Sequence, residues 1–327
     1  MKAVVVKRFG GPDVLSYEDV EMPKAGRGEV LIKVLATSVN FADIKARVGE
    51  YHGVKSSTFI PGLDCAGVIE QVGEGVTSLK VGQRVIAFPK NGSYAEYVVA
   101  NERLTYPIPD ELSTEVAAAS LTVGVTAYNV LKKMARLSEG ESVLIHAAAG
   151  GVGTTAVQLA KKFGASKIIG TVGSDEKKEL VLKLGADEVI NYREADFVEE
   201  VNRITEGKGV DVILDTISGE TFERGFDCLA YYGRIVIFGH ANDGSKPGII
   251  KTDLLHASCR SVIGYSTGTS RKMRPEFLKE AAEAVISLLT RGELTMHISK
   301  KFPLKDAGEA QAFIESRKSQ GKVLLIP

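Results

Sequence analysis

The run Ser142-Val143-Leu144-Ile145-His146-Ala147-Ala148-Ala149-Gly150-Gly151-Val152-Gly153 decides the fold. Its first five residues form a short apolar run after polar neighbours, which is typical of a buried strand. Small residues follow, and the apolar positions over 154–162 predict a helix that Gly164 ends. The sequence therefore predicts a strand that enters a glycine turn, and a turn that opens a helix.

A turn of this kind binds anions, because the first free N–H groups of the helix and the positive end of its dipole face the turn. Side chains at Gly150, Gly151 and Gly153 would keep a pyrophosphate away from the backbone, or the helix away from the strand. The spacing is Ala-x-Gly-Gly-x-Gly instead of the usual G-x-G-x-x-G, and glycines also mark ordinary turns. The position between a strand and a helix favours dinucleotide binding over a plain turn.

Length and composition set the class of protein. The chain has 327 residues, enough for two domains with separate cores, and its 44% apolar and 25% charged residues are typical of a soluble globular protein. Lys and Arg number 41, as do Asp and Glu, so the neutral chain has no overall attraction for nucleic acid or an anionic membrane. Composition does not exclude a local basic patch that binds nucleic acid or a membrane.

The cysteines and the first residues bear on the cellular compartment. Cys65, Cys228 and Cys259 are far apart in sequence and form neither a disulfide framework nor a clustered metal motif. The apolar run at 3–6 is too short for a signal peptide, and no apolar run reaches membrane-spanning length. We therefore expect a reduced, cytoplasmic protein.

The pattern of strands changes near residue 122. Residues 1–122 contain short β-branched or alternating runs separated by Gly and Pro, a pattern that favours a partly closed barrel. The strands expected there are Ala3–Val6, Glu29–Ala36, Ala66–Val72, Arg84–Phe88 and Ala95–Ala100. Over 123–264, strands alternate with helices, as in a doubly wound parallel sheet. The expected strands there are Val143–His146, Lys167–Thr171, Glu188–Asn191, Val210–Asp215, Arg234–Gly239 and Ser261–Gly264.

The tail, residues 265–327, is not a regular βαβ unit. Helices are expected at Pro275–Arg291 and Asp306–Ser316, with strands at Thr295–Ser299 and Val323–Ile326. We expect this segment to return to the first domain and complete it. The predicted fold class is thus α/β, with a partly open β-barrel domain that is discontinuous and a doubly wound parallel-sheet domain.

Several long motifs carry a family resemblance. These are Asn40-Phe41-Ala42-Asp43 with Arg47-Val48-Gly49-Glu50-Tyr51, Pro61 to Ile69, Val72 to Val76, Val81 to Val85, Ala148 to Gly153, and Gly321 to Pro327. The chain resembles the zinc-free quinone oxidoreductases, the zeta-crystallin-like family of the medium-chain dehydrogenase/reductase superfamily, over essentially its full length. The resemblance implies a GroES-like catalytic domain and a Rossmann domain.

Departures from zinc-bearing relatives bear on the chemistry. Those enzymes carry Cys-x-x-Asp and Gly-His-Glu where this chain has Asn40-x-x-Asp43 and Gly62-Leu63-Asp64. Leu63 cannot ligate zinc and Asn40 offers no thiolate, and residues 88–97 lack the cysteines of a structural zinc lobe. We expect no zinc, which removes the main support for an alcohol dehydrogenase mechanism through a metal alkoxide.

The end of the strand at 167–171 decides between NAD and NADP. An acid usually binds the ribose 2′-OH there, but Val172-Gly173-Ser174 has none, and Asp175 and Glu176 follow as acids of a helix first turn that Ser174 would cap. Ser174 and Lys177 offer a hydroxyl and a cation to a 2′-phosphate. The sequence favours NADPH over NADH, although Lys177 alone would be an ordinary solvated lysine. The resemblance implies that Gly173, Lys177 and Tyr192 form this subsite, with Arg317 a further candidate; Tyr192 alone would be a core tyrosine.

The resemblance also implies the reaction centre. It places Asn40 and Thr126 beside the nicotinamide, and Tyr51 and Tyr128 in an acceptor pocket. On local sequence alone Asn40 would be a turn residue and Thr126 an ordinary helix residue. The cofactor-binding residues expected in total are Asn40, Thr126, Ala149, Gly150, Gly151, Val152, Gly153, Gly173, Ser174, Lys177, Tyr192, Phe238, Gly239, His240, Ala241 and Arg317, of which 238–241 end a parallel strand.

The remaining polar residues are given ordinary roles. Asp43 and Arg47 are expected to form a loop ion pair, and His146 and His240 to be packed or solvated. No Ser/His/Asp or Cys/His arrangement is recognisable.

Three functions remain open at this point. The first is an NADPH-dependent quinone reductase that acts on quinones or similar conjugated carbonyls. The second reduces enals, enones or enoyl thioesters, and the third is a nucleotide-binding regulator of low turnover. The residues identify neither the natural acceptor nor the proton donor. A homodimer is expected from the family, through the sheet edge at Ser261–Gly264.

Overall fold

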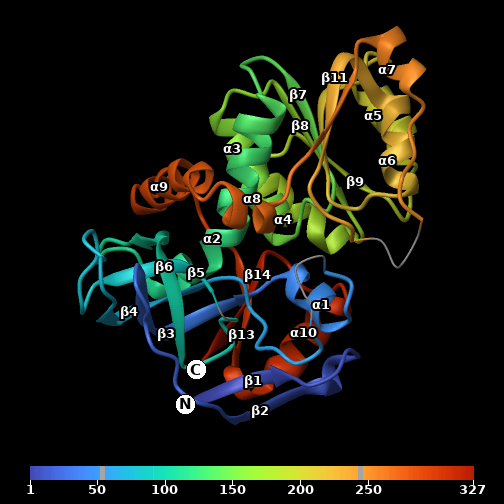
Figure 1. The fold of residues 1–327 in the computed structure, drawn as a ribbon. Coiled ribbons are helices and arrows are strands. Elements are labelled where there is room, and N and C mark those ends of the chain that lie inside the picture. The colour runs from blue at the N-terminus through green and yellow to red at the C-terminus, as the bar shows by residue number, and fades with distance from the viewer. Residues whose placement is uncertain (52–55, 91, 242–245) are drawn as a thin grey trace. The chain divides into compact units, whose positions relative to one another are not determined.

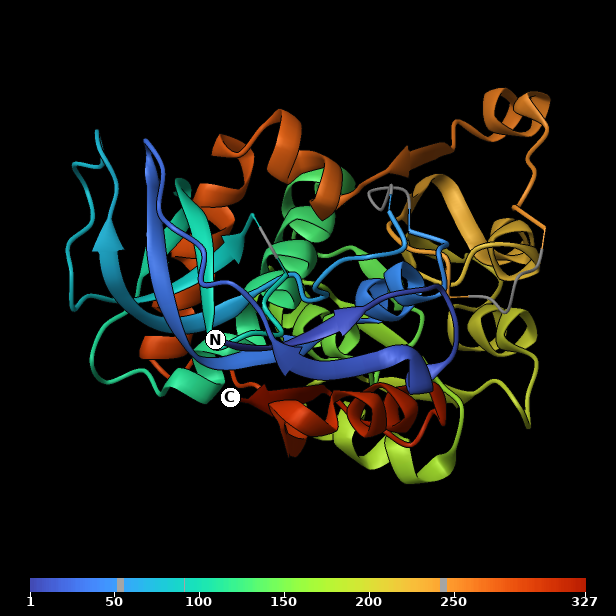
Figure 2. The ribbon, with the colours of Figure 1, turned by 60° about the horizontal axis from the view of Figure 1, so that its bottom comes forward.

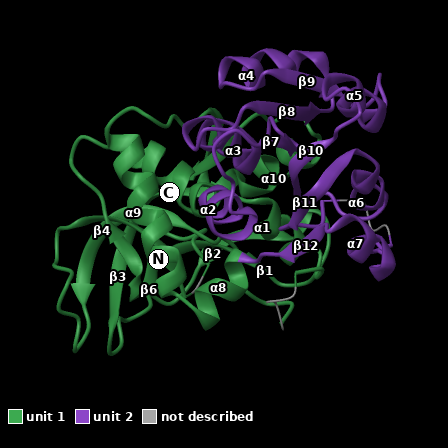
Figure 3. Cartoon of the chain, turned by 90° about the horizontal axis from the view of Figure 1, so that it is seen from above, with its two compact units in different colours: residues 1–125, 267–327 green, residues 126–266 purple. Residues whose placement is uncertain are grey.

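The computed structural model describes residues 1–51, 56–90, 92–241 and 246–327 (Figure 1). These residues fall into two compact units (Figure 3). Unit 1 contains Met1–Val125 and Thr267–Pro327, and unit 2 contains Thr126–Ser266. The domain limits predicted from the sequence, 1–122, 123–264 and 265–327, lie close to these divisions.

Unit 2 is built on a parallel sheet in the order β12-β11-β10-β7-β8-β9. The strands are β7 (Ser142–Ile145), β8 (Lys167–Val172), β9 (Glu188–Asn191), β10 (Val210–Asp215), β11 (Leu229–Ile237) and β12 (Ser261–Gly264). This order is that of the doubly wound dinucleotide-binding fold, so the predicted Rossmann fold is confirmed. The strand order reverses between β7 and β10, and such a switch point is where open α/β sheets bind ligands.

Helices connect the strands of this sheet. They are α3 (Gly151–Lys162), α4 (Lys178–Lys183), α5 (Phe197–Ile204), α6 (Glu220–Gly225) and α7 (Thr252–Ser258), with a π-helix η2 (Asn129–Ala135) and short 3₁₀ turns η3 (Asp175–Lys177) and η4 (Phe226–Cys228). Buried Leu144, Ile213 and Ile235 of the strands pack with Phe197 and Phe222 of the helices. Burial of these apolar side chains stabilises the layered unit, because each removes apolar surface from water.

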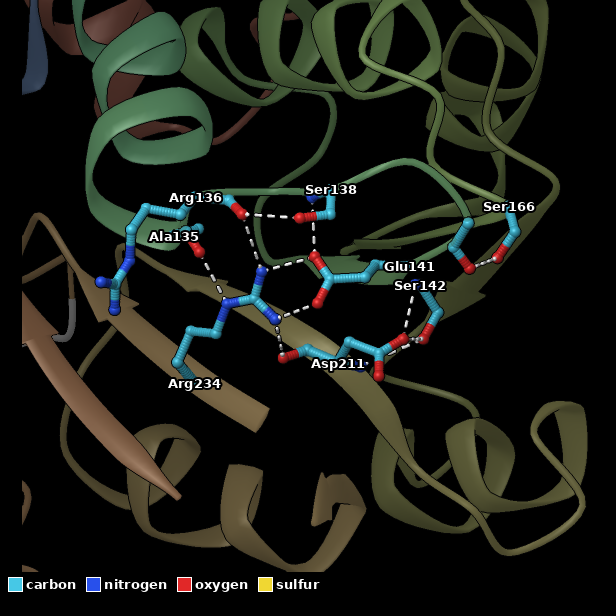
Figure 4. Close-up of polar contacts among 9 residues, drawn as sticks. Ala135, Arg136, Ser138, Glu141, Ser142, Ser166, Asp211 and Arg234 are labelled. Carbon is cyan, nitrogen blue, oxygen red and sulfur yellow. Dashed lines mark hydrogen bonds and ion pairs between the residues drawn. The ribbon is translucent and has the colours of Figure 1, made fainter. Parts of the chain in front are cut away.

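A polar cluster fixes the amino ends of three strands of unit 2 (Figure 4). Arg234 of β11 donates to both carboxylate oxygens of Glu141, each at 2.5 Å, and its Nε donates to the carbonyl of Ala135 at 2.7 Å. Asp211 of β10 accepts hydrogen bonds at 2.7 Å from the backbone N–H and the hydroxyl of Ser142 in β7. The bidentate pair is partly buried, and this geometry is the strong form of the interaction.

The sheet of unit 1 has the order β13-β14-β3-β4-β5-β6, with a further pairing of β3 and β6. Its strands are β3 (Glu29–Val39), β4 (Cys65–Val72), β5 (Arg84–Pro89), β6 (Tyr97–Pro107), β13 (Ile298–Pro303) and β14 (Lys322–Ile326). Because β3 pairs with both β4 and β6, four strands close on themselves, and the predicted partly closed barrel is confirmed. β14 pairs with β3, so the tail joins the barrel sheet.

A two-stranded ribbon and several helices complete unit 1. Figure 2 shows the ribbon of β1 (Lys2–Val6) and β2 (Leu15–Asp19) with the C-terminal helix α10 close to it. The helices are α1 (Phe41–Arg47), α2 (Thr114–Tyr128, whose last three residues belong to unit 2), α8 (Thr267–Met273), α9 (Glu276–Thr290) and α10 (Ala307–Glu315), with 3₁₀ turns η1 (Pro12–Val14) and η5 (Leu304–Asp306).

Three elements of unit 1 differ from the sequence expectation. The strand expected at Thr295–Ser299 is β13, which begins at Ile298 and pairs with β14. The strand expected at Ala95–Ala100 is β6, which continues to Pro107 because it pairs first with β3 and then with β5. The strand β2 was not predicted, because its residues are mostly half-buried or exposed and carry two acids.

Among the helices of the described residues, none is both long enough and apolar enough to cross a lipid bilayer.

Candidate cofactor and acceptor sites

The glycine turn of unit 2 is formed by backbone groups. Ala147 has a left-handed backbone (φ 52°), and the Gly150 N–H donates to its carbonyl at 2.9 Å. Gly150 is the N-cap of α3, and its carbonyl accepts from the Thr154 hydroxyl at 3.0 Å. The first turn of α3 contains no acidic residue. Its first N–H groups therefore face the turn without a competing anion.

The two outer glycines of this turn are needed for different reasons. A Cβ at Gly153 would lie 2.4 Å from the carbonyl oxygen of Ala147 and 2.6 Å from Cα of Ala148, so only glycine lets α3 pack this closely. A Cβ at Gly150 would approach that same oxygen only to 3.3 Å, so nothing inside the chain forbids it strictly. The turn fits the diphosphate of a dinucleotide, because a bare backbone cradle lies at the start of a helix.

The segment after β8 lies at the carboxyl edge of the unit 2 sheet, because β8 runs parallel to its neighbour β7. Asp175 forms an ion pair with Lys178 at 2.5 Å and accepts a hydrogen bond from Asn191 at 3.3 Å, and the Lys178 ammonium lowers the pKa of this carboxyl. The Asp175 carboxylate is thus engaged by its own neighbours instead of being free to bind a ribose 2′-OH. Ser174 precedes η3, as expected for a cap, but its side chain forms no capping hydrogen bond.

Gly173 and Tyr192 lie together in the structure, as the predicted 2′-phosphate subsite requires. A Cβ at Gly173 would lie 2.7 Å from the Tyr192 hydroxyl oxygen. Tyr192 is 46% exposed, which is far from the environment of a core tyrosine. Lys177 ends η3 beside this segment, whereas Arg317 belongs to unit 1, with a left-handed φ of 59°, and its assignment stays a prediction.

Residues 238–241 follow β11 at the carboxyl edge of the same sheet. The Phe238 N–H donates to the Asp215 carbonyl at 3.0 Å, and the Ala241 N–H to the Thr216 carbonyl at 2.9 Å. A Cβ at Gly239 would lie 2.4 Å from the Thr216 hydroxyl oxygen. This segment is therefore bonded to the end of β10, the strand that pairs with β7 at the switch point.

His146 lies at this edge in a packed position. Its Nδ1 is 3.1 Å from the Thr171 hydroxyl, and its ring meets Phe197 edge-on at 5.1 Å. Burial lowers the pKa of His146, which favours the neutral ring. The sequence expectation that this histidine is packed agrees with these contacts.

Unit 1 contains a buried polar network around Asn40. Asn40 begins α1, and its backbone N–H donates to the Asp43 carboxylate at 2.8 Å. Its side-chain nitrogen donates to Asp64 at 3.1 Å and to the Ser38 hydroxyl at 3.2 Å, and its oxygen accepts from the Lys322 ammonium at 2.7 Å. Asn40 is only 6% exposed, so it is more than a surface turn residue.

Three ionisable groups of this network are almost completely buried. Burial raises the pKa of Asp43 to about 7, with the Asp64 charge as a further cause. Burial also lowers the pKa of Lys322, against the attraction of both carboxylates. Asp64 accepts hydrogen bonds from the Ser38 hydroxyl at 2.6 Å and the Thr122 backbone N–H at 2.9 Å. The Lys322 ammonium, which also donates to the Val39 carbonyl at 3.0 Å, thus offsets part of the charge of the two buried acids.

The donor set of this network does not fit a zinc ion. The Lys322 ammonium already contacts the Asn40 oxygen, and a second cation there would be repelled. Leu63 supplies no ligand, and no group of three or more potential ligands occurs among the residues that the structure describes.

The predicted pocket residues have different surroundings. Tyr51 is partly buried, and burial raises the pKa of its phenol while Arg271 opposes the shift. Thr126 is 7% exposed near the end of α2. The Tyr128 ring meets Phe163 edge-on at 5.8 Å, and Phe163 caps the end of α3 that is opposite the glycine turn. The roles of these residues stay predictions, and for Tyr128 the observed contact is one of packing.

The expected ion pair between Asp43 and Arg47 is wrong. Arg47 instead forms a bidentate pair with Glu315 of α10, at 2.5 and 3.2 Å, and donates to Gln311 at 2.8 Å. Asp43 bonds the Asn40 N–H and the Tyr94 hydroxyl. Local spacing suggested the wrong partner, because the true one is 268 residues further along the chain.

Sequence reasoning also missed Ser38 and Lys322 as members of the Asn40 network. The only signal in the sequence was that Lys322 directly precedes the apolar run 323–326. A lysine in that position is buried only if it finds acidic partners, and otherwise it is exposed. Nothing local identifies its partners.

Two family models match the chain. One describes an alcohol dehydrogenase GroES-like domain and matches residues 26–110, and the other describes a zinc-binding dehydrogenase and matches residues 151–283. The second match begins with α3, covers the rest of the Rossmann unit and extends into α9.

Curated relatives and solved structures match over the full length. Quinone oxidoreductase 1 of Escherichia coli is 38% identical, with 98% of each chain covered. The 2-haloacrylate reductase of a Burkholderia species is 34% identical, with 99% of this chain and 98% of the relative covered. The structure of Escherichia coli quinone oxidoreductase complexed with NADPH has a TM-score of 0.92 at 36% identity, with all of both chains covered. The protein is therefore an oxidoreductase, and it belongs to the quinone oxidoreductase family of the medium-chain dehydrogenase/reductase superfamily.

Proposed function

We propose that the protein is an NADPH-dependent quinone oxidoreductase that reduces quinones or similar conjugated carbonyls without zinc. The observation that carries the proposal is the glycine turn at the switch point, where a Cβ at Gly153 would collide with the chain and the first turn of α3 contains no acid. The name of the Escherichia coli relative supports the acceptor class, and the NADPH in the structure of that protein supports the cofactor.

Unit 2 holds the cofactor in this proposal. The backbone of residues 149–153 binds the diphosphate, and residues 238–241 contact the nicotinamide half. Gly173, Ser174, Lys177 and Tyr192 bind the 2′-phosphate, with Arg317 as a further candidate. The ion pair of Asp175 with Lys178 supports NADPH over NADH, because a free acid there would repel a phosphate.

Unit 1 supplies the groups that act on the acceptor, together with Thr126. When bound, NADPH supplies a hydride to the conjugated acceptor. Asn40 exchanges its bonds to Ser38, of 3.2 and 3.3 Å, for one to the acceptor oxygen as negative charge develops there. Lys322 and Asp64 hold the amide in place, and Tyr51 forms part of an aromatic wall. Substitution of Asn40 by Ala should lower kcat about 10-fold or more while the Kd for NADPH stays nearly unchanged; unchanged turnover would remove Asn40 from this role.

A second function has a specific observation in its favour. The relative that is 34% identical is named a 2-haloacrylate reductase, and its substrate is a conjugated acid rather than a quinone. Reduction of enals, enones, acrylates or enoyl thioesters uses the same cofactor. A regulatory nucleotide-binding protein is the weakest alternative, because the chain carries no net charge to attract nucleic acid.

One assay separates these functions. The purified protein is mixed with NADPH, and the absorbance of the reduced cofactor is followed with 1,4-benzoquinone, 9,10-phenanthrenequinone, an enal and crotonyl-CoA in parallel. Fastest oxidation with the quinones supports the proposal. Oxidation only with the enal or the thioester supports the second function, and tight NADPH binding without oxidation leaves the regulator.

Separate observations support a homodimer and a cytoplasmic location for the protein. β12 is the edge strand of the unit 2 sheet, and an exposed edge favours pairing with a second copy in a homodimer. The three cysteines are free thiols, as a reducing cytoplasm would keep them. Size-exclusion chromatography with light scattering would test the dimer.

A further inference from the structure

Three polar side chains lie next to one another at the carboxyl edge of the unit 2 sheet. The parallel ladders of β7 with β8 and with β10 stay in register up to the residues just before Thr171, His146 and Asp215. Residues at the same level of adjacent strands have side chains on the same face of a sheet. Two bonds support the alignment: His146 Nδ1 is 3.1 Å from the Thr171 hydroxyl, and the His146 N–H donates to the Leu214 carbonyl at 3.1 Å.

Two atoms of this polar row are buried without a hydrogen-bond partner among the described residues. They are Nε2 of His146, which is 4% exposed, and Oδ2 of Asp215, which is fully buried. The other carboxylate oxygen of Asp215 accepts from the backbone N–H groups of Ile217 and Ser218, at 2.6 and 2.9 Å. Buried polar atoms without a partner are costly and rare. Their occurrence on two adjacent residues therefore indicates one shared partner.

The contacts of the row assign the proton of the imidazole. Burial lowers the pKa of His146, so the ring is neutral and has one N–H donor and one acceptor nitrogen. The Thr171 hydroxyl can donate to Nδ1, which leaves the proton on Nε2. In the other tautomer, Nε2 would be an acceptor beside the acceptor Oδ2. A water that accepts from Nε2–H and donates to Oδ2 satisfies both atoms, as ordered waters do in other protein interiors.

The row adjoins two segments that the proposed function assigns to NADPH. His146 directly precedes Ala147, whose left-handed φ of 52° begins the glycine turn. The Asp215 carbonyl accepts from the Phe238 N–H at 3.0 Å, so the segment 238–241 is bonded to the end of β10. A shift of the end of β10 against the end of β7 would therefore move 238–241 relative to the glycine turn.

We propose that His146 and Asp215 are positioning residues for NADPH, joined by one buried water that accepts from Nε2–H and donates to Oδ2. The inference rests on the proposed NADPH binding and adds two residues that act through the backbone beside them. The bridge fixes the spacing between the glycine turn, which binds the diphosphate, and residues 238–241, which contact the nicotinamide half. A cofactor that spans both segments binds more tightly when their spacing is set in advance, because less order has to be created on binding.

The test compares His146→Phe, Asp215→Asn and the double variant with two controls. The controls are His256→Phe and Asp253→Asn, which change exposed side chains of α7 in the same unit. Cofactor fluorescence gives the Kd for NADPH, and steady-state rates with 1,4-benzoquinone give KM and kcat. Each single change in the row should raise the Kd and KM for NADPH about 3- to 10-fold, while kcat changes less than about 2-fold. The controls should bind NADPH as the natural chain does.

The double variant tests the bridge itself. Its Kd should be no weaker than that of the weaker single variant, because either change already breaks the same connection. Unfolding midpoints, measured for every variant, separate this effect from a loss of structure. Unchanged NADPH affinity in both single variants, additive losses in the double variant, or a fall in kcat that follows the loss of stability would overturn the inference.

A measurement on the natural chain does not depend on how well the variants fold. Nitrogen-15 NMR of the protein labelled at its five histidines should show His146 as a neutral ring with its proton on Nε2. A proton on Nδ1 would overturn the inference. Absence of NADPH binding by the natural chain would instead overturn the proposed function.

Discussion

The glycine turn of unit 2 and the Asn40 network of unit 1 are built in opposite ways. The turn consists of backbone groups from consecutive residues, and its shape depends on the missing side chain at Gly153, where a Cβ would lie 2.4 Å from the Ala147 oxygen. The network consists of side chains that meet only after folding, such as Asn40 and Lys322, which are 282 residues apart. An added Cβ is therefore expected to disturb the turn, whereas a lost charge is expected to disturb the network. The following predictions use that difference.

Loss of Lys322 should have the largest effect. Lys322→Met removes the cation that attracts two buried carboxylates and donates to the Asn40 oxygen, and leaving buried charge uncompensated in this way costs about 3–5 kcal/mol of unfolding free energy. Denaturant unfolding would measure the loss. Lys301→Met is the control, because the pair of Lys301 with Glu115 is about half exposed, and its loss should cost less than about 1 kcal/mol. Similar losses in the two variants would contradict the network.

The network should also make stability depend on pH through Asp43. Its pKa rises from 3.8 in the unfolded chain to about 7, so the folded chain holds a proton that the unfolded chain releases. This contribution is fully present below about pH 4 and is lost as the pH rises to about 7, by about 4 kcal/mol at most. Asp43→Asn should flatten the fall in unfolding free energy between about pH 4 and pH 7; an unchanged slope would assign it to other groups.

The glycine turn should separate stability from binding. Gly153→Ala places a Cβ 2.4 Å from a backbone oxygen, which should cost about 1–3 kcal/mol of stability as well as NADPH affinity. Gly150→Ala adds a Cβ at 3.3 Å, so the variant should unfold nearly as the natural chain does and still bind NADPH about 10-fold more weakly or worse. Gly264→Ala, whose Cβ meets nothing within 4 Å, is the control. Normal affinity in Gly150→Ala would exclude the turn as the diphosphate site.

The smallest effect should come from the ribose end. Lys177→Ala removes one cation from the proposed 2′-phosphate subsite and should reduce the preference for NADPH over NADH about 10-fold, without a change in NADH affinity. Steady-state KM values for both cofactors would show this. An equal loss of affinity for NADPH and NADH would indicate that Lys177 only stabilises the local helix and does not contact the 2′-phosphate.

The difference between the local glycine turn and the Asn40 network, whose members are far apart in sequence, explains which features could be predicted from the sequence. The Rossmann unit, its strands and the glycine turn were predictable, because hydrophobic runs and glycine spacing are local. The ion pair of Arg47 with Glu315 and the bond of Lys322 to Asn40 were not, because each joins residues more than 260 positions apart. Asp64 was singled out in the sequence as part of the Gly62-Leu63-Asp64 motif. Its hydrogen bonds to Ser38 and Thr122 could not be predicted, because they depend on how β3, β4 and α2 pack.

The return of β14 to β3 has a consequence for the order of events during synthesis. Unit 2 is encoded between the two parts of unit 1, so its six strands can assemble while the last residues of β3, 37–39, still lack their pairing with β14. Until β14 emerges, Asp43 and Asp64 remain hydrated and no cation holds Asn40. A nascent chain can therefore form its Rossmann unit before the Asn40 network is complete, and the slow, sequence-distant pairing of β14 with β3 becomes the step at which a folding intermediate is most open to chaperones or proteases.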